Sequence, residues 1–322
     1  MSAPLLEVED LSVSFRYRDR TVTPLEGVTL SVRQGEGVGI VGESGSGKST
    51  LALALLRLTP AARNLKISGR IHFEGRDVLA MSKRELCDYR GGGVALIPQD
   101  PMTSLNPTLS VARQVGETIR LGRPGGASEA ETLEALAAVR IPEPQTRLNA
   151  YPHQLSGGLR QRVVGAIGIA RGPRLLIADE PTTALDVTVQ RRYLDMLNGL
   201  RRERNMAMVF ISHDLGVVAH ICERIVVLYA GQIVEDGPLR DILDRPRHWY
   251  TAALVAAARG VSGAHNRLPA IGGAPPSLTN LPPGCRFAPR CPNAQPQCET
   301  PPDLLTESDG HRLRCHFPRA AT

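Results

Sequence analysis

The chain has 322 residues, of which 42% are hydrophobic and 22% charged, a composition typical of a globular protein with about two domains. Aromatic residues amount to only 4%, and the net charge of +6 comes from arginines spread along the chain, so we expect no nucleic-acid partner. No apolar run approaches the roughly 18 residues that cross a bilayer, and the N-terminus lacks a basic region followed by an apolar one. A soluble, cytoplasmic protein is therefore expected.

The predicted elements alternate between strands and helices along the first 260 residues. Strand-like patterns lie at residues 5–33, 37–41, 67–98, 175–180, 206–214 and 223–237, with an apolar helix at 50–58 and a helical block at 101–170. Strands that alternate with helices predict an α/β protein with a mostly parallel sheet. We expect the helical block, about residues 101–170, to be a subdomain inserted into that core.

The composition changes near residue 258. Residues 260–322 hold 11 of the 25 prolines and four of the six cysteines. Because proline interrupts helices and central strands, this segment predicts a small separate domain that is held together by something other than a hydrophobic core. The expected domains are therefore residues 1–258 and a Cys/Pro-rich domain at residues 259–322.

Residues 42–49 read GESGSGKS, which fits the pattern G-x-x-x-x-G-K-[ST] between a buried strand and an apolar helix. Glycines let such a loop curl so that backbone N–H groups and the N-terminus of the following helix face phosphate oxygens. Lys48, one of only three lysines, would reach the β- and γ-phosphates, and the Ser49 hydroxyl would coordinate Mg²⁺. The alternative, an ordinary glycine-rich turn, does not require these flanking elements. The residues expected to bind the nucleotide here are Gly42, Ser44, Gly45, Gly47, Lys48, Ser49 and Thr50.

A second acidic element follows at residues 175–180, which read LLIADE. Asp179 at the end of this apolar strand presents a carboxylate for Mg²⁺, and Glu180 is the candidate general base for an attacking water. Two acidic residues at a strand end are common by themselves. Downstream of a phosphate loop they predict an enzyme that hydrolyses nucleoside triphosphates, a P-loop NTPase.

Residues 155–161 read LSGGLRQ and enter an apolar helix. This stretch resembles LSGGQ, the signature of the ATP-binding-cassette (ABC) family, in which Ser156, Gly157 and Gly158 provide a second set of phosphate donors at a helix N-terminus. Leu159 stands where glutamine is usual, but the backbone donors remain. A serine cap followed by flexible glycines is the alternative for these letters in isolation.

Further motifs of the family occur in the same order, and the resemblance covers residues 5 to about 250. It implies that Gln99 is the Q-loop glutamine, which senses Mg²⁺ and couples to the transmembrane partner. Residues 183–186 match the D-loop, which ends in Asp186. The resemblance also implies that His213 contacts the γ-phosphate and that Tyr17, or Phe15 in its place, stacks on adenine.

The family resemblance implies that two cassettes dimerise head to tail, with each ATP between the phosphate loop of one and the signature of the other. This chain has one cassette, so the second comes from another copy or another gene product. The same resemblance implies that ATP binding closes the pair and that hydrolysis reopens it. A subunit that binds ATP but hardly hydrolyses it is disfavoured by the intact Lys48, Asp179, Glu180 and His213.

Two stretches resemble the ATP-binding subunits of bacterial dipeptide/oligopeptide importers: residues 97–107 (IPQDPMTSLNP) and the tail from residue 274 to Cys315. This resemblance implies a motor for peptide uptake at the cytoplasmic face of the inner membrane, working with a second ABC ATPase, usually a different gene product, two permeases and a solute-binding protein. Nickel, glutathione, antimicrobial peptides and sugars are alternative cargoes. The alternative from another class is a soluble ABC protein of translation or DNA repair, but those usually carry two cassettes or a long coiled-coil insertion.

The clustered cysteines are Cys285, Cys291, Cys298 and Cys315, separated by 5, 6 and 16 residues. Four thiolates could hold zinc or an iron–sulfur cluster, and in a chain without a secretory leader metal binding is more common than disulfides. Structural zinc favours short C-x₂₋₄-C pairs, which are absent here. The resemblance implies a [4Fe-4S] cluster, with zinc or four reduced, packed cysteines as alternatives. Cys87 and Cys222 are expected to be ordinary buried residues.

Overall fold

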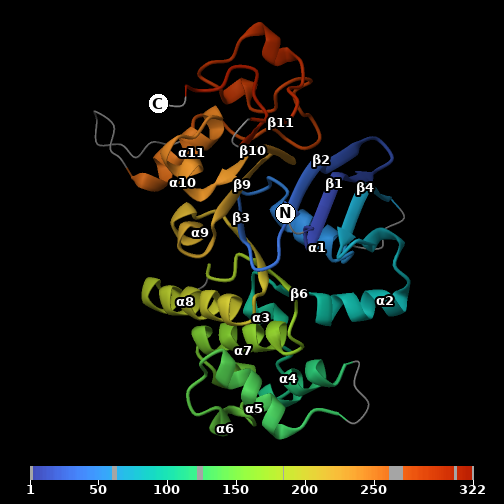
Figure 1. The fold of residues 1–322 in the computed structure, drawn as a ribbon, viewed down its shortest axis with the longest axis vertical. Helices are drawn as coiled ribbons and strands as arrows, with labels where there is room; N and C mark the ends of the chain where they lie inside the picture. Colours follow the sequence, from blue (N-terminus) through green and yellow to red (C-terminus); the bar gives the residue numbers. More distant parts are fainter. Residues whose placement is uncertain are drawn as a thin grey trace. The chain divides into compact units, whose positions relative to one another are not determined.

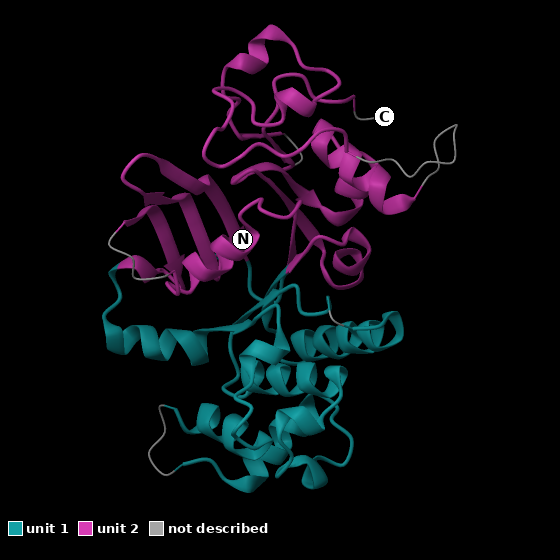
Figure 2. Ribbon diagram, turned by 180° about the vertical axis from the view of Figure 1, so that it is seen from behind, with its two compact units in different colours: residues 1–3, 33–36, 80–210 teal, residues 4–32, 37–79, 211–322 magenta. Residues whose placement is uncertain are grey.

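The computed structural model describes residues 3–59, 64–121, 126–183, 185–260, 271–307 and 310–320. The chain forms two compact units, each built from segments far apart in the sequence (Figure 2). Unit 1 comprises residues 1–3, 33–36 and 80–210, and unit 2 comprises residues 4–32, 37–79 and 211–322. The domain boundary predicted at residue 258 is not one of these divisions and stays a prediction.

Unit 2 contains an antiparallel sheet with the strand order β2-β1-β4-β5 (Figure 1). Its strands are β1 (Leu6–Arg16), β2 (Thr21–Val32), β4 (Leu65–Phe73) and β5 (Arg76–Asp77). Leu6 pairs with Val32 on one side and with Phe73 on the other. In β1 the buried positions begin at Leu6 and Val8 and alternate with half-buried ones, as expected for a sheet with one covered face.

The second sheet of unit 2 has the order β11-β12-β10-β9-β3. Its strands are β3 (Gly37–Val41), β9 (Arg224–Tyr229), β10 (Gln232–Pro238), β11 (Leu305–Thr306) and β12 (Arg312–Leu313). β3 is parallel to β9 and wholly buried, which agrees with the continuous apolar run of its sequence. The tail contributes to this sheet, because its strand β12 pairs with β10.

The helices of unit 2 flank these strands. They are α1 (Lys48–Leu55), α9 (Leu215–Ile221), α10 (Leu239–Asp244) and α11 (Trp249–Arg259). Beyond residue 270 the described residues contain only the 3₁₀ turns Ala288–Arg290 and Pro296–Glu299 and the two short strands. This agrees with a proline content that excludes long helices.

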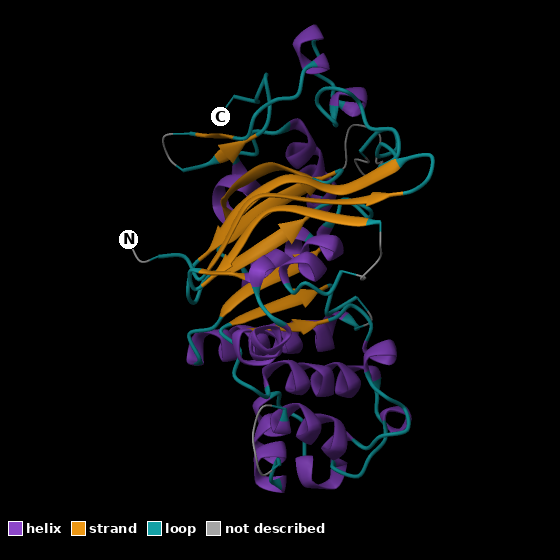
Figure 3. Ribbon diagram, turned by 90° about the vertical axis from the view of Figure 1, so that its right-hand side faces the viewer, coloured by secondary structure: helices purple, strands orange, loops and turns teal. Residues whose placement is uncertain are grey.

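Unit 1 is built around the parallel pair β6 (Val94–Ile97) and β7 (Leu175–Asp179). Strand β8 (Ala207–Ser212) lies beside β7, and the boundary between the units falls within β8. Its helices are α2 (Lys83–Asp88), α3 (Pro101–Ser104), α4 (Val111–Arg120), α5 (Glu129–Ala138), α6 (Pro144–Arg147), α7 (Gly157–Ile169) and α8 (Val187–Glu203). Helix α7 packs against β6 and also against α3, α4 and α5. Figure 3 shows the α4–α7 end of unit 1 as helices and loops, and no strand lies among the described residues of 101–170.

The α/β fold class is confirmed, with two local corrections. Residues 78–93, predicted as strand, instead contain helix α2 and adjoining turns. The reason is a capping box in which Ser82 and Glu85 satisfy each other's backbone N–H groups. Cys222 is buried as expected, but Cys87 is exposed because Leu86 is the residue that α2 buries.

Candidate functional site

The loop between β3 and α1 can be built only from glycine at several positions. Gly45 and Gly47 have φ of +77° and +104°, in the left-handed region where a side chain is strained. A Cβ at Gly42 would lie 2.2 Å from the carbonyl oxygen of Leu228, and one at Gly47 would lie 2.5 Å from that of Pro24. The spacing of the motif is therefore a steric requirement of the turn between this strand and helix.

The donors around this loop fit phosphate. Within the described residues no side chain caps the N-terminus of α1, and no acidic residue lies in its first turn. Lys48 is buried and its Nζ donates to the carbonyl oxygens of Gly42 and Glu43, at 2.8 and 2.9 Å. Ser46 is also buried, and its Oγ has no hydrogen-bond partner among the described residues. An uncapped helix N-terminus, a cation and a hydroxyl donor together form a site for a polyphosphate.

The remaining residues predicted around this loop are accessible. Ser44, Gly45 and Ser49 are exposed, and Thr50 is half-buried. Their positions allow a ligand to approach the loop from solvent, and exposure leaves the Ser49 hydroxyl available for a cation.

Two other predicted residues of unit 2 lie at the ends of strands. Tyr17 follows β1 and is 50% exposed, with the Arg20 guanidinium 6.0 Å from its ring centroid. Phe15 is half-buried and paired within β1, so Tyr17 is the more available aromatic surface. His213 follows β8 and is exposed, immediately before Asp214, whose carboxylate accepts from the backbone N–H of Gly216 at 2.8 Å.

In unit 1 the structure brings Gln99 and Glu180 together. The Gln99 amide donates to Oε2 of Glu180 at 3.3 Å, and the Thr183 hydroxyl donates to the same oxygen at 3.2 Å. Glu180 has φ of +45°, a strained value for a residue with a side chain, directly after the buried Asp179 at the end of β7. Sequence reasoning missed the contact of Thr183, although its position three residues after Glu180 is what permits it.

The signature residues begin α7. The Ser156 hydroxyl caps this helix by accepting from the N–H of Leu159 at 3.4 Å. A Cβ at Gly158 would lie 2.9 Å from a methyl of Val189 in α8, whereas Gly157 has open space around it. Gln161 is buried, so it does not replace the glutamine that is usual at position 159.

The predicted D-loop leads into α8. The Asp186 carboxylate caps this helix by accepting from the N–H of Val189 at 2.9 Å. Ala184, the second residue of this motif, lies outside the described residues. Asp186 therefore has a structural contact besides the role predicted for it.

The four tail cysteines are free thiols. Burial raises the pKa of Cys285, Cys291 and Cys315, the last to about 11, and the neighbouring cysteines raise these values further. Among the described residues, no three His, Cys, Asp or Glu side chains are arranged to hold a metal ion. The thiols thus lie within electrostatic range of one another but are not in ligating positions, and a bound metal would have to displace their protons.

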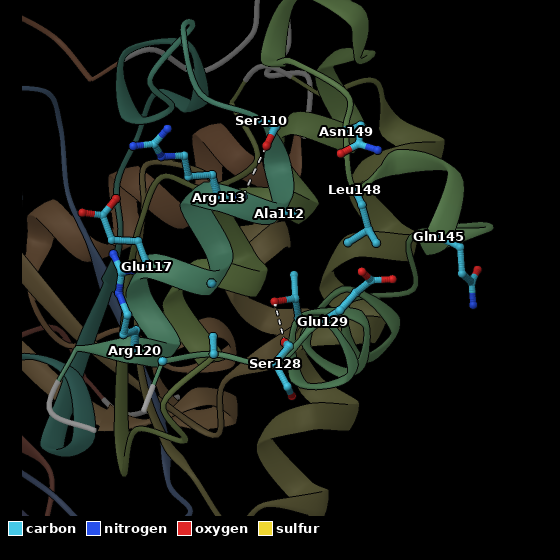
Figure 4. Close-up of a pocket in the computed structure, with 14 residues that line it drawn as sticks. Ser110, Ala112, Arg113, Glu117, Arg120, Ser128, Glu129, Gln145, Leu148 and Asn149 are labelled. Carbon is cyan, nitrogen blue, oxygen red and sulfur yellow. Dashed lines mark hydrogen bonds between the residues drawn. The ribbon is translucent and has the colours of Figure 1, made fainter. Parts of the chain in front are cut away.

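A pocket of about 680 Å³ lies between α4, α5 and the loop after α6 in unit 1 (Figure 4). Arg113, Glu117 and Arg120 come from α4, and Ser128 and Glu129 come from the start of α5. None of the residues predicted to bind nucleotide lines this pocket. It is therefore separate from the predicted ATP chemistry.

Comparisons with known proteins identify the class. Residues 25–183 match the family described as "ABC transporter", and residues 234–298 match "Oligopeptide/dipeptide transporter, C-terminal region". Among solved structures, the dimeric post-hydrolysis state of an ATP-binding cassette bound to ADP and Pi superposes with a TM-score of 0.65 at 28% identity, covering 73% of this chain and 99% of that one. Fold and phosphate loop thus define an ABC-type P-loop ATPase.

Similarity to individual proteins extends over nearly the whole chain. The oligopeptide transport ATP-binding protein OppD of Salmonella typhimurium is 46% identical over 316 residues, covering 98% of this chain and 94% of the relative. OppD of Escherichia coli is 45% identical, covering 98% and 93%. This chain belongs to the ATP-binding subunits of the oligopeptide/dipeptide ABC transporters. None of the helices in the described part of the chain combines the length and apolarity needed to span a bilayer.

Proposed function

We propose that this chain is the ATP-hydrolysing motor subunit of a membrane importer of di- and oligopeptides. The observation that carries the proposal is the similarity to OppD over 98% of the chain, which includes the transporter-type C-terminal region as well as the cassette. The same motor role in import of nickel, glutathione, antimicrobial peptides or sugars is the alternative. The cargo is selected by other subunits, so the ATP chemistry does not distinguish these possibilities.

In the proposed ATP site, the phosphate loop binds the polyphosphate. The N–H groups at the start of α1 and the Lys48 ammonium meet phosphate oxygens, with Lys48 exchanging the carbonyl oxygens of Gly42 and Glu43 for the β- and γ-phosphates. Magnesium, when bound, neutralises phosphate charge. The residues proposed to hold it are Ser49, Gln99 and Asp179.

Hydrolysis needs a base that receives a proton from the attacking water. We assign this role to Glu180, whose carboxylate is oriented by the donors on Gln99 and Thr183. The water oxygen bonds to the γ-phosphorus, the bond to the β-phosphate oxygen breaks, and ADP and phosphate leave. His213 contacts the γ-phosphate and Tyr17 stacks on adenine. Ser156, Gly157, Gly158 and Asp186 act toward the nucleotide held with the partner cassette.

The partners follow from the same relationship. A second ABC ATPase, usually a different gene product, completes the ATP-binding pair, and two permeases and a solute-binding protein complete the importer. The chain acts as a peripheral subunit at the cytoplasmic face of the bacterial inner membrane, without a nucleic-acid partner. The names of the OppD relatives, which describe oligopeptide transport, support this assignment.

We further propose that the tail cysteines Cys285, Cys291, Cys298 and Cys315 hold a [4Fe-4S] cluster. The support is four thiols in one proline-rich segment, with Cys285, Cys291 and Cys298 close enough to raise the pKa of Cys315. Loading requires the thiols to move into ligating positions and lose their protons. Iron and sulfide near four per chain after anaerobic purification are expected. Zinc in their place, or no metal with the tail folded, would contradict the cluster.

Uptake tests the transport function. Cells that lack this gene would be given a panel of labelled di- and oligopeptides after complementation with wild type or Lys48→Ala. We expect uptake to fall in the deletion strain and to return only with wild type. Unchanged peptide uptake would refute the peptide cargo and direct the search to metals, glutathione or sugars.

A further inference from the structure

The tail reaches the phosphate loop through one arginine. Arg290 lies between Cys285 and Cys291, and its side chain is only 3% exposed. Its Nη1 lies 2.6 Å from Oε2 of Glu43 and its Nη2 lies 3.0 Å from Oε1, so the guanidinium binds the carboxylate with two parallel hydrogen bonds. Glu43 is the second residue of the phosphate loop.

The remaining donors of Arg290 hold it in place. Its Nε donates to the carbonyl oxygen of Gly272 at 2.8 Å, Nη2 donates to that of Ile271 at 3.3 Å, and Nη1 donates to the Tyr229 hydroxyl at 3.2 Å. The guanidinium also lies 5.8 and 6.0 Å from the ring centroids of Tyr229 and Phe287. These contacts restrict the rotation of the Arg290 side chain, so its guanidinium is held in the orientation that binds both carboxylate oxygens of Glu43.

Glu43 is held from its backbone as well. Its N–H donates to the hydroxyl of Tyr250 in α11 at 2.8 Å, and its carbonyl oxygen accepts from Lys48 at 2.9 Å. The tail, α11 and the phosphate-binding lysine therefore meet on one residue. A shift of this residue displaces the start of the loop whose N–H groups must face phosphate.

We propose that Arg290 is a positioning residue for nucleotide binding, through which the tail segment 285–291 holds the phosphate loop in its ATP-binding shape. The inference rests on the proposed ATP site and adds a part of the chain to it. A cassette without this contact would keep Lys48 and its glycines but bind ATP more weakly. Because the geometry of phosphate contacts is lost by small displacements, we expect a loss of roughly tenfold or more.

The test measures the dissociation constant of a fluorescent ATP analogue for the full-length chain. Arg290→Gln and Glu43→Gln should each weaken binding about tenfold, and the double variant should bind no more weakly than either one, because both remove the same contact. Glu307→Gln is the matched control. It removes an ion pair with Arg247, also between the tail and the rest of unit 2, that does not involve the phosphate loop, and it should leave binding unchanged.

Lys48→Ala separates this inference from the proposed site. Wild-type affinity in Lys48→Ala would refute the ATP site itself, whereas loss of binding there with wild-type affinity in Arg290→Gln would refute only the role of Arg290. Additive losses in the double variant, or an equal loss in Glu307→Gln, would also overturn it. If Arg290→Gln does not fold, Arg290→Lys with Glu43→Gln makes the same comparison.

Discussion

Glu235 is a carboxylate without solvent exposure that joins the tail to helix α11. Its Oε1 accepts from the N–H of Arg247 at 2.7 Å, and its Oε2 accepts from the N–H of His248 at 2.9 Å. The Nε2 of His311 in the tail lies 2.9 Å from Oε1. One side chain thus satisfies two backbone groups at the start of a helix and a buried histidine.

Glu235→Ala should therefore destabilise the protein strongly. The variant removes the acceptor of three donors, of which the His248 N–H and the His311 ring are buried and the Arg247 N–H is part-buried. Each lost contact costs about 1–3 kcal/mol, so the expected loss is about 3–9 kcal/mol in the free energy of unfolding. Glu235→Gln keeps one oxygen acceptor and should lose about 1–3 kcal/mol. His311→Ala removes one of the three contacts, and its loss in the free energy of unfolding should be similar to that of Glu235→Gln.

Urea unfolding followed by circular dichroism measures these differences. Arg240→Gln is the control. Among the described residues, the one ion pair of Arg240 is an exposed contact with Asp244 in α10 at 3.7 Å, so this variant should change stability by less than about 1 kcal/mol. A loss below about 1 kcal/mol in Glu235→Ala would refute the reasoning. So would a loss in Arg240→Gln as large as that in Glu235→Ala.

Three further predictions concern catalysis and pH. Glu180→Gln should lower phosphate release by the assembled transporter about 10²–10⁴-fold while ATP remains bound, and full turnover would exclude Glu180 as the base. Thr183→Val removes one donor to Glu180 and should lower kcat a few-fold, about 3 to 10, without changing KM for ATP, whereas a change in KM alone would point to binding instead. Burial lowers the pKa of His248 to about 4, against the opposing charge of Glu235. Because the unfolded chain then protonates first, the stability contributed by neutral His248 is complete above about pH 6.5 and is lost toward pH 4. His248→Asn keeps an acceptor for the N–H of Tyr250 and should flatten the pH dependence of unfolding in this window, and an unchanged slope would contradict the assignment.

The phosphate loop could be predicted because its chemistry is local. The eight residues 42–49 contain both the steric requirement for glycine and the cation, and the flanking strand and helix have clear periodicity. The prediction of strand at residues 78–93 was wrong because the local sequence carries little signal there. Its helix α2 is six residues long and buries only Leu86, so no apolar period marks it, and the capping box at Ser82 was the only available signal.

Contacts between distant residues could not be predicted in the same way. Gln99 and Glu180 were each assigned a role, but the hydrogen bond between them joins residues 81 positions apart. The pair Glu43–Arg290 spans 247 positions. Neither Glu43 nor Arg290 belongs to a periodic pattern, and arginine is too frequent in this chain for one of them to attract attention. Strands β11 and β12 have two residues each, which is too short for an alternating pattern to appear.

The structure changes how the stability of the tail is understood. Among the described residues beyond 270, the buried hydrophobic side chains are only those of Phe287 and Leu313, so the segment has almost no core of its own. Polar contacts also join this segment to the rest of unit 2: the β12–β10 pairing, His311 with Glu235 and Arg290 with Glu43. The last of these contacts ends on the phosphate loop, and the proposed role of Arg290 makes docking of the tail and binding of nucleotide linked equilibria. Linkage is reciprocal, so under the proposal the loss of ATP affinity when docking through Arg290 is abolished equals the free energy by which bound ATP stabilises docking.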